Sequence, residues 1–234
     1  MKVFVSALAW FSGLIGLAIC MPLLLLNAFF ASPQGISNGS RLLMRVLIAF
    51  FFVRVTVSNL ETARRQGPCV FMANHASFFD HFALAAYLPG MHRGMEAGEH
   101  FSWPIWGTFL RKTGFVAVDR SSAAASMRSM KLAAAKITDE GASMLILPEG
   151  TRSRDGKLLP FNRLPFSVPR TARCPLVPVG LKGPFRIKNK NSWLLRPGRI
   201  EMIFGEPIPA DEVERLSAKE LAALTRARIA ALIA

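Results

Sequence analysis

The chain has 234 residues, enough for one domain with a sizeable hydrophobic core and a short accessory segment, and too few for two full domains. Its net charge is +14, yet its mean hydropathy is +0.31 and only 19% of its residues are charged, a combination that indicates membrane association. A nucleic-acid partner is not expected, because the chain has one tyrosine and no motif that reads DNA or RNA.

The first predicted element is a long apolar helix at the N-terminus. No charged residue occurs from Val3 to Ser40, and residues 3–30 are almost wholly apolar. A helix of that length would exceed the roughly 30 Å hydrocarbon core of a bilayer. Lys2 before an apolar region is also typical of a signal peptide, but this region is too long and no Ala-x-Ala cleavage site follows it. We therefore expect a retained membrane helix.

A turn and a second, more basic segment follow. Residues 32–39 are predicted to form a turn, and residues 41–54, apolar with arginines at intervals, an interfacial helix. The N-terminal part, residues 1–54, is then either a true span or a helical hairpin in one leaflet, and the sequence leaves both open. By the positive-inside rule, arginines place the rest of the chain, residues 55–234, on the cytoplasmic side of the inner membrane: Arg41, Arg45, Arg54, Arg64 and Arg65.

From about residue 68 the pattern is that of an α/β domain. Short runs rich in β-formers and bounded by Gly, Pro or polar residues predict strands at residues 69–73, 115–118, 144–147, 176–179 and 200–204. Helices are predicted from Ser122 to Glu140, with Gly141 after its end, and from a capping box at Ser217 to about Ala234. This alternation predicts a mostly parallel mixed sheet flanked by helices.

The cysteines and histidines do not indicate a metal or a disulfide. Three cysteines, Cys20, Cys69 and Cys174, are an odd number without a Cys-x-x-Cys pair, which fits a reducing compartment. The four histidines lack a helical metal-ligand spacing. We expect neither a bound metal nor a cofactor.

The first motif, residues 74–80, follows the strand predicted at 69–73. His75 should therefore lie at the carboxyl edge of the sheet, where α/β proteins place their sites. A neutral imidazole there can accept a proton from a hydroxyl, with Asp80 fixing its tautomer, provided that His75 precedes the helix and Asp80 lies in its first turn. The alternative is a capping box from Ser77 to Asp80 with His75 as a structural loop residue. His81 is expected to point elsewhere.

Two later motifs end in arginines. Arg120 follows a strand and precedes a helix start, where a guanidinium and free N–H groups can bind an anion. The turn Pro148-Glu149-Gly150-Thr151-Arg152 follows another strand. There Glu149 can orient an acceptor hydroxyl, and N–H groups around Gly150 can face an anion. The alternatives are a solvated arginine at 120 and a structural βα turn capped by Thr151.

Together the motifs resemble those of the glycerolipid acyltransferases, the family of bacterial 1-acyl-glycerol-3-phosphate acyltransferase. The family has four blocks in order: His-x4-Asp, a Gly-to-Arg block, Pro-Glu-Gly-Thr and a Val-Pro-Val strand. This chain matches them at His75/Asp80, Gly114 to Arg120, Pro148 to Arg152, and Val177-Pro178-Val179. The resemblance covers roughly residues 55–210 and makes chance agreement of all four blocks improbable.

The resemblance implies a membrane-bound O-acyltransferase of phospholipid biosynthesis. Such enzymes move a fatty acyl chain from acyl-CoA or acyl-carrier protein directly to the free hydroxyl of 1-acyl-glycerol-3-phosphate, giving phosphatidic acid without an acyl-enzyme. It also implies roles for the matching residues. His75 would be the general base and Asp80 its partner. The acceptor and its phosphate would be bound by Arg120, Glu149, Gly150, Thr151 and Arg152, and the acyl channel lined by Val177, Pro178 and Val179.

Two departures from the family pattern leave the acceptor open. Gly98 and Asn162 stand where the family has lysines that help to hold the acceptor phosphate, and Arg163 replaces only the charge of the second. Another lyso-lipid, such as a lysophospholipid or a lyso-aminolipid, is therefore the alternative acceptor. A non-enzymatic lipid-binding protein is the alternative of another class, and the presence of both His75 and Asp80 argues against it.

A basic segment near the C-terminal third has no place in the four blocks. Its cations are interleaved with Phe185 and Trp193, and they are Lys182, Arg186, Lys188, Lys190, Arg196 and Arg199. The segment is either a patch for anionic lipid headgroups, the acidic carrier protein or coenzyme A phosphates, or a solvated loop.

Overall fold

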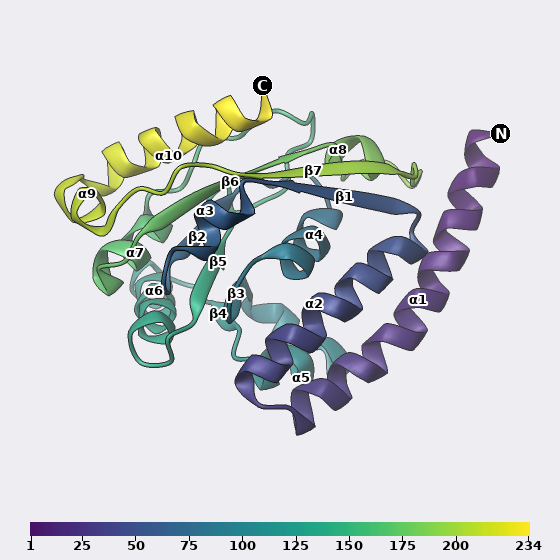
Figure 1. Ribbon diagram of the computed structural model, residues 1–234, viewed down its shortest axis with the longest axis horizontal. Coiled ribbons are helices and arrows are strands. Elements are labelled where there is room, and N and C mark those ends of the chain that lie inside the picture. Colours follow the sequence, from purple (N-terminus) through teal and green to yellow (C-terminus); the bar gives the residue numbers. More distant parts are fainter.

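One seven-stranded sheet organises the chain, and the computed structural model describes all residues from 1 to 234 (Figure 1). The strand order is β1-β7-β6-β2-β5-β3-β4. The strands are β1 (Val53–Ser58), β2 (Val70–Ala73), β3 (His92–Ala97), β4 (Val116–Val118), β5 (Ser143–Ile146), β6 (Leu176–Lys182) and β7 (Gly198–Phe204). Every neighbouring pair is parallel except β6 with β7. The predicted mostly parallel mixed sheet is confirmed.

Both faces of the sheet are buried, which explains why its strands read as continuous apolar runs. Successive side chains of a strand point to opposite faces. In β2, Phe71 and Ala73 join one buried cluster, whereas Val70 and Met72 join a second one on the other face. Strand β2 lies between β5 and β6, so its carboxyl end is near the middle of the sheet edge.

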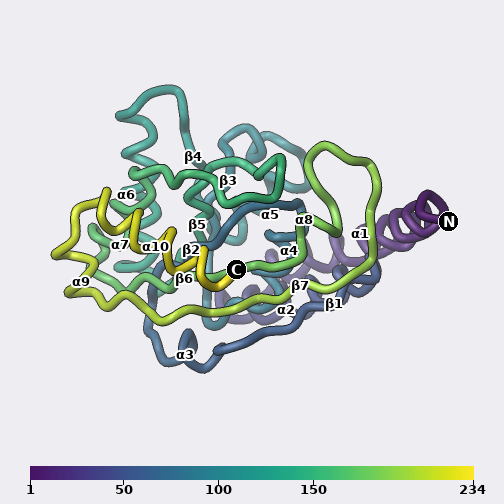
Figure 2. Tube along the Cα trace, turned by 90° about the horizontal axis from the view of Figure 1, so that it is seen from above, coloured from purple at the N-terminus to yellow at the C-terminus, as the bar shows by residue number.

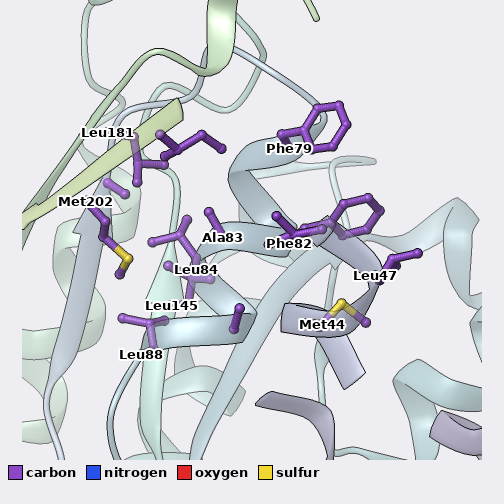
Figure 3. Packing of buried hydrophobic residues seen from close by; sticks show 14 of the residues in the cluster. Met44, Leu47, Phe79, Phe82, Ala83, Leu84, Leu88, Leu145, Leu181 and Met202 are labelled. Carbon is purple, nitrogen blue, oxygen red and sulfur yellow. The ribbon is translucent and has the colours of Figure 1, made fainter. Parts of the chain in front are cut away.

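Four helices cover the first face: α1 (Lys2–Phe30), α2 (Pro33–Phe50), α4 (Phe79–Tyr87) and α5 (Pro104–Lys112). Helix α4 is enclosed between the sheet and α2. Figure 3 shows its Phe82 on the side of Met44 and Leu47 from α2, and its Leu84 beside Leu145 from β5. Phe79, in the first turn of α4, is fully buried. The helix that carries Asp80 is therefore fixed from both sides.

The second face is covered by α6 (Ala123–Thr138), α7 (Ser167–Ala172), α9 (Ala210–Arg215) and α10 (Ala218–Ile233). The predicted helix starts are confirmed. Ser122 is the N-cap of α6 and accepts a hydrogen bond from the N–H of Ala125, and Ser217 forms a complete capping box with Glu220 at the start of α10. Gly141 follows α6 with φ +64°, as expected for a residue after a helix end.

The segment after α1 differs from the prediction at both of its ends. Residues 32–39 were expected to form a turn, but α2 begins at Pro33 because Ser32 caps it by accepting the N–H of Gly35 and proline suits the first helical position. The helix ends at Phe50 rather than continuing to residue 54. Val53 and Arg54 instead open β1, where β-branched residues pair in parallel with β7.

Strands β1 and β3 were not predicted. Residues 53–58 do alternate between valine and a polar residue, but the first two of them were assigned to the preceding basic helix, and β3 has no clear apolar alternation. The remaining short elements are α3 (Leu60–Arg64), α8 (Pro184–Ile187) and the 3-10 turns at Gly98–Ser102 and Leu164–Phe166. Helices α1 and α2 lie side by side at one end of the molecule, antiparallel to each other, and pack directly on the α/β part through α4 and α5 (Figure 1).

Candidate active site

His75 and Asp80 meet between the end of β2 and the start of α4. His75 lies in the connection that follows Ala73, and Asp80 is in the first turn of the helix. The Nδ1 atom of His75 is 2.8 Å from Oδ2 of Asp80. The Asp80 side chain is fully buried and that of His75 is 11% exposed. This is the placement that a dyad at this spacing requires.

The Asp80 carboxylate also caps the backbone before α4. Its Oδ2 accepts the N–H groups of Ala76 at 2.6 Å and Ser77 at 2.8 Å. The Asp80 carboxylate therefore caps the backbone before α4 and also pairs with His75, so it makes the contact that each interpretation of the motif requires. Because Oδ2 of Asp80 already accepts two backbone N–H groups, Nδ1 of His75 is the donor in this pair, and the Nε2 lone pair has no hydrogen-bonding partner within the protein. The imidazole is in the tautomer that a general base needs.

His81 does not point away, contrary to the expectation. Its ring centroid lies 5.0 Å from that of His75, and the two planes are nearly perpendicular at 83°. Burial, followed by the neighbouring His75, lowers the pKa of His81. A neutral imidazole packed edge to face against His75 restricts the ring without adding a charge beside it.

Glu149 holds the backbone of His75. Its Oε1 accepts the N–H of His75 at 2.6 Å, and its Oε2 accepts the N–H of Leu159 at 2.9 Å. Burial raises the pKa of Glu149, and these two hydrogen bonds oppose that shift. With both oxygens engaged, the carboxylate joins the third motif to the first. Its predicted contact with an acceptor hydroxyl stays a prediction.

The turn that follows Glu149 brings the second motif into the same site. Arg120, after β4, donates from Nη2 to the carbonyl of Gly150 at 3.2 Å. Gly150 has φ +69°, a conformation that L side chains rarely adopt, and this turn exposes Thr151 and leaves Arg152 half-buried. Ser153 then donates its N–H to the carbonyl of His75 at 2.9 Å. The first three motifs therefore form one continuous cluster.

The fourth block lies in the sheet beside β2, away from the polar cluster. Val177 is in register with Phe71, and Val179 with Ala73. Val177 and Val179 are fully buried in the cluster that also contains α4, and Pro178 lies between them in β6. Their assignment to an acyl channel stays a prediction.

Sequence reasoning did not place the basic segment that contains Lys188 and Lys190 beside these motifs. Ser77 donates its hydroxyl to the carbonyl of Lys188 at 2.6 Å, and the Nζ atom of Lys190 lies 3.3 Å from Oγ1 of Thr151. Ser77 and Lys188 are 111 positions apart, so no local pattern relates them. In the structure, no group of three or more His, Cys, Asp or Glu side chains has an arrangement for holding a metal ion.

Comparison with known proteins places this site in context. The family model described as Acyltransferase matches residues 54–182, which include all four blocks. The 1-acyl-sn-glycerol-3-phosphate acyltransferase of Bacillus subtilis is 31% identical over 175 residues, covering 74% of this chain and 83% of that protein. The enzymes of that name from Limnanthes douglasii and Cocos nucifera are 30% and 32% identical, and this chain spans only 59% and 51% of their lengths.

A solved structure supports the fold independently. The crystal structure of the 1-acyl-sn-glycerophosphate (LPA) acyltransferase PlsC from Thermotoga maritima superposes with a TM-score of 0.85, covering 98% of this chain and 95% of that one. The two chains are 19% identical in sequence. At that identity the match shows a shared fold, which includes the N-terminal helices as well as the sheet.

Proposed function

This chain belongs to the acyltransferase family, and on that premise we propose that it transfers a fatty acyl group to the free hydroxyl of 1-acyl-glycerol-3-phosphate, giving phosphatidic acid. The proposed donor is acyl-CoA or acyl-carrier protein. One observation carries the proposal: Nδ1 of His75 is held by Asp80 at 2.8 Å while its Nε2 is left free to accept a proton.

In the proposed reaction His75 first accepts a proton from the acceptor and then gives it to the leaving group. His75 Nε2 takes the proton of the acceptor hydroxyl as its oxygen attacks the thioester carbonyl, and Asp80 stabilises the resulting imidazolium. The new C–O bond forms, the C–S bond breaks, and the imidazolium returns the proton to the departing thiolate. Glu149 acts indirectly, because its hydrogen bond fixes the backbone of His75.

The arginines of the cluster supply the proposed anion site. Arg120 is anchored to the carbonyl of Gly150, and Arg152 lies on the same turn. Guanidinium groups suit phosphate because they present parallel donors to two of its oxygens. The names of the relatives, which all specify 1-acyl-sn-glycerol-3-phosphate, support this acceptor over other lyso-lipids.

Membrane attachment is proposed to be through a hairpin of α1 and α2 in one leaflet. Helix α1 is long and apolar enough to cross a bilayer, with exposed side chains that include Phe4, Phe11 and Phe30. However, the α/β part contacts α1 near both ends, at Ser6 through Leu195 and at Phe29 through Lys112. These contacts are about 35 Å apart along the helix, a distance similar to the thickness of the hydrocarbon core. If α1 crossed the whole bilayer, the polar α/β part that contacts it near both ends would lie within the hydrocarbon core.

The arginines in α2 and after it support an orientation towards the cytoplasm, on the inner membrane. Among them, Arg41 donates to the carbonyls of Leu88 and Gly90, and Arg45 donates to that of Ala86, so both also fasten α2 to the end of α4.

A lyso-lipid panel tests the proposal. Protein in membranes would receive 1-acyl-glycerol-3-phosphate, lysophospholipids and a lyso-aminolipid, each with acyl-CoA and with acyl-carrier protein, and products would be identified by mass. We expect phosphatidic acid, and a His75→Ala variant should form it about 10²- to 10⁴-fold more slowly. Equal rates for the two proteins would contradict the proposal, and acylation of another lyso-lipid alone would replace the acceptor.

A further inference from the structure

Two lysines from a distant part of the chain reach the turn of the third motif. Lys188 and Lys190 lie in the loop that joins α8 to β7. The ammonium of Lys190 is 3.3 Å from the hydroxyl of Thr151, and Lys188 is close enough to Arg152 for their charges to interact. The loop therefore shares the sheet edge with the residues proposed to hold the acceptor.

The backbone of Lys188 is fastened to the loop that carries the proposed general base. Ser77, fully buried and two residues after His75, donates its hydroxyl to the carbonyl of Lys188 at 2.6 Å. This bond involves no atom of the lysine side chain. Replacement of the Lys188 side chain would keep this bond to Ser77 and would remove one contact within the loop, the bond from the Lys188 ammonium to the carbonyl of Asn189 at 2.8 Å.

The cations around the turn have no acidic partner. None of the six ion pairs in the structure includes Arg120, Arg152, Lys188 or Lys190. Burial, followed by the charge of Arg152, lowers the pKa of Lys188. Such repulsion between neighbouring cations is relieved when an anion binds between them.

The nearby carboxylates are already engaged. Asp80 accepts from His75 and from two backbone N–H groups through Oδ2, while its Oδ1 is buried without a hydrogen-bonding partner, and Glu149 accepts the N–H groups of His75 and Leu159. Neither carboxylate forms an ion pair with a lysine. The arrangement of two ammonium groups and a guanidinium without a carboxylate suits a phosphate monoester, which carries up to two negative charges on three oxygens.

The same loop extends from this site to the N-terminal helix. Leu195 donates its N–H to the hydroxyl of Ser6 at 2.9 Å, and Trp10 donates its indole N–H to the carbonyl of Trp193 at 3.0 Å. Figure 2 shows the loop after α8 passing beside α1. A lipid held in the bilayer beside α1 would present its headgroup to this loop, with its acyl chain towards the apolar helix.

We infer that Lys188 and Lys190 bind the phosphate of the acceptor together with Arg152, taking the place of the family lysines that are absent at Gly98 and Asn162. The inference rests on the proposed function and assigns part of its acceptor site to a loop outside the four motifs. It also gives these two lysines a ligand different from a coenzyme A or carrier-protein phosphate.

Steady-state kinetics of a Lys188→Met, Lys190→Met double variant test this assignment. Methionine keeps most of the side-chain length and removes the charge. Because the phosphate loses two charged hydrogen-bond donors, we expect the KM for 1-acyl-glycerol-3-phosphate to rise by roughly a hundredfold or more. The kcat and the KM for the donor should stay unchanged. The inhibition constant of sn-glycerol 3-phosphate, a soluble competitor with the same phosphate, should rise by the same factor.

Two matched variants control the experiment. Lys131→Met removes an exposed ammonium on α6, far from the site, and should leave all constants unchanged. A Lys188→Arg, Lys190→Arg variant keeps both charges and should recover most of the acceptor affinity, which a purely structural role would not require. Melting temperatures would confirm that each variant is folded.

The outcomes separate this inference from the proposed function. If the unmodified protein acylates 1-acyl-glycerol-3-phosphate and the double variant keeps its acceptor KM, or shows a higher donor KM instead, the inference is overturned and the proposed function stands. If the unmodified protein does not acylate this acceptor at all, both are overturned.

Discussion

The carboxylate of Glu149 accepts the backbone N–H of His75 at 2.6 Å, so the third motif holds the residue on which the first depends. Its other oxygen holds Leu159, on the far side of the turn. The three motifs are therefore one mechanical unit at the carboxyl ends of β2 and β5. A change in any one of them is expected to move the others.

Glu149→Gln should slow turnover without weakening acceptor binding. The amide keeps one acceptor oxygen, so either His75 or Leu159 loses the partner of its N–H, at a cost of about 1–3 kcal/mol. We expect a lower melting temperature and a reduced kcat with an unchanged acceptor KM. Glu206→Gln, on an exposed side chain, is the control. A raised acceptor KM at normal kcat would instead support direct contact between Glu149 and the acceptor.

Asp80→Asn should nearly abolish activity in a folded protein. The amide can still accept the N–H groups of Ala76 and Ser77, but it removes the charge that stabilises the His75 imidazolium. We expect kcat to fall about 10²- to 10⁴-fold. Initial rates and circular dichroism would be compared with those of Asp211→Asn, an exposed carboxylate. Activity close to that of this control would exclude a dyad.

His92 should make stability sensitive to acid. Burial, followed by the charge of Arg41, lowers its pKa to about 4, against an ordinary value of 6.5. The unfolded chain therefore binds the proton more readily than the folded one, so stability falls as the pH drops from 6.5 towards 4. The loss attributable to this group is about 3 kcal/mol.

Unfolding of detergent-solubilised protein across that pH range would measure the effect. His92→Gln removes the titrating group, so the variant should lose less stability than the unmodified protein between the same two pH values. Identical losses would show that His92 does not contribute to the acid sensitivity.

Gly150→Ala should distort the turn that links Arg120 to the site. At φ +69° an L side chain costs about 1–2 kcal/mol. Its Cβ would also lie 2.9 Å from Nδ2 of Asn162. We expect a lower melting temperature together with reduced activity. Gly67→Ala is the matched control, because a Cβ there meets nothing within 4 Å. Equal behaviour of the two variants would show that the turn tolerates a side chain.

Features with a local signal were predictable. Five strands were predicted because each is a short apolar run between turn residues. Helices α6 and α10 were predicted because each is preceded by a serine that caps it. The His75 to Asp80 spacing belongs to the same class, since both residues lie on one short connection. Strand β1 was missed although residues 53–58 alternate, because residues 53 and 54 were assigned to the preceding helix; what no local pattern shows is its pairing with β7, about 145 positions away.

The layered α/β fold, the apolar N-terminal helix and the order of the four motifs could be predicted from the amino-acid sequence alone, because they depend on periodicity, composition and spacing within short stretches. The contacts of the motif residues could be learned only from the three-dimensional arrangement of the chain. In that arrangement Glu149 accepts the backbone N–H of His75, and His81 packs against the imidazole of His75. Ser77 donates to the carbonyl of Lys188, 111 positions away. Side-chain contacts between distant segments depend on how strands are ordered in the sheet, and that order has no signature in any single stretch of residues.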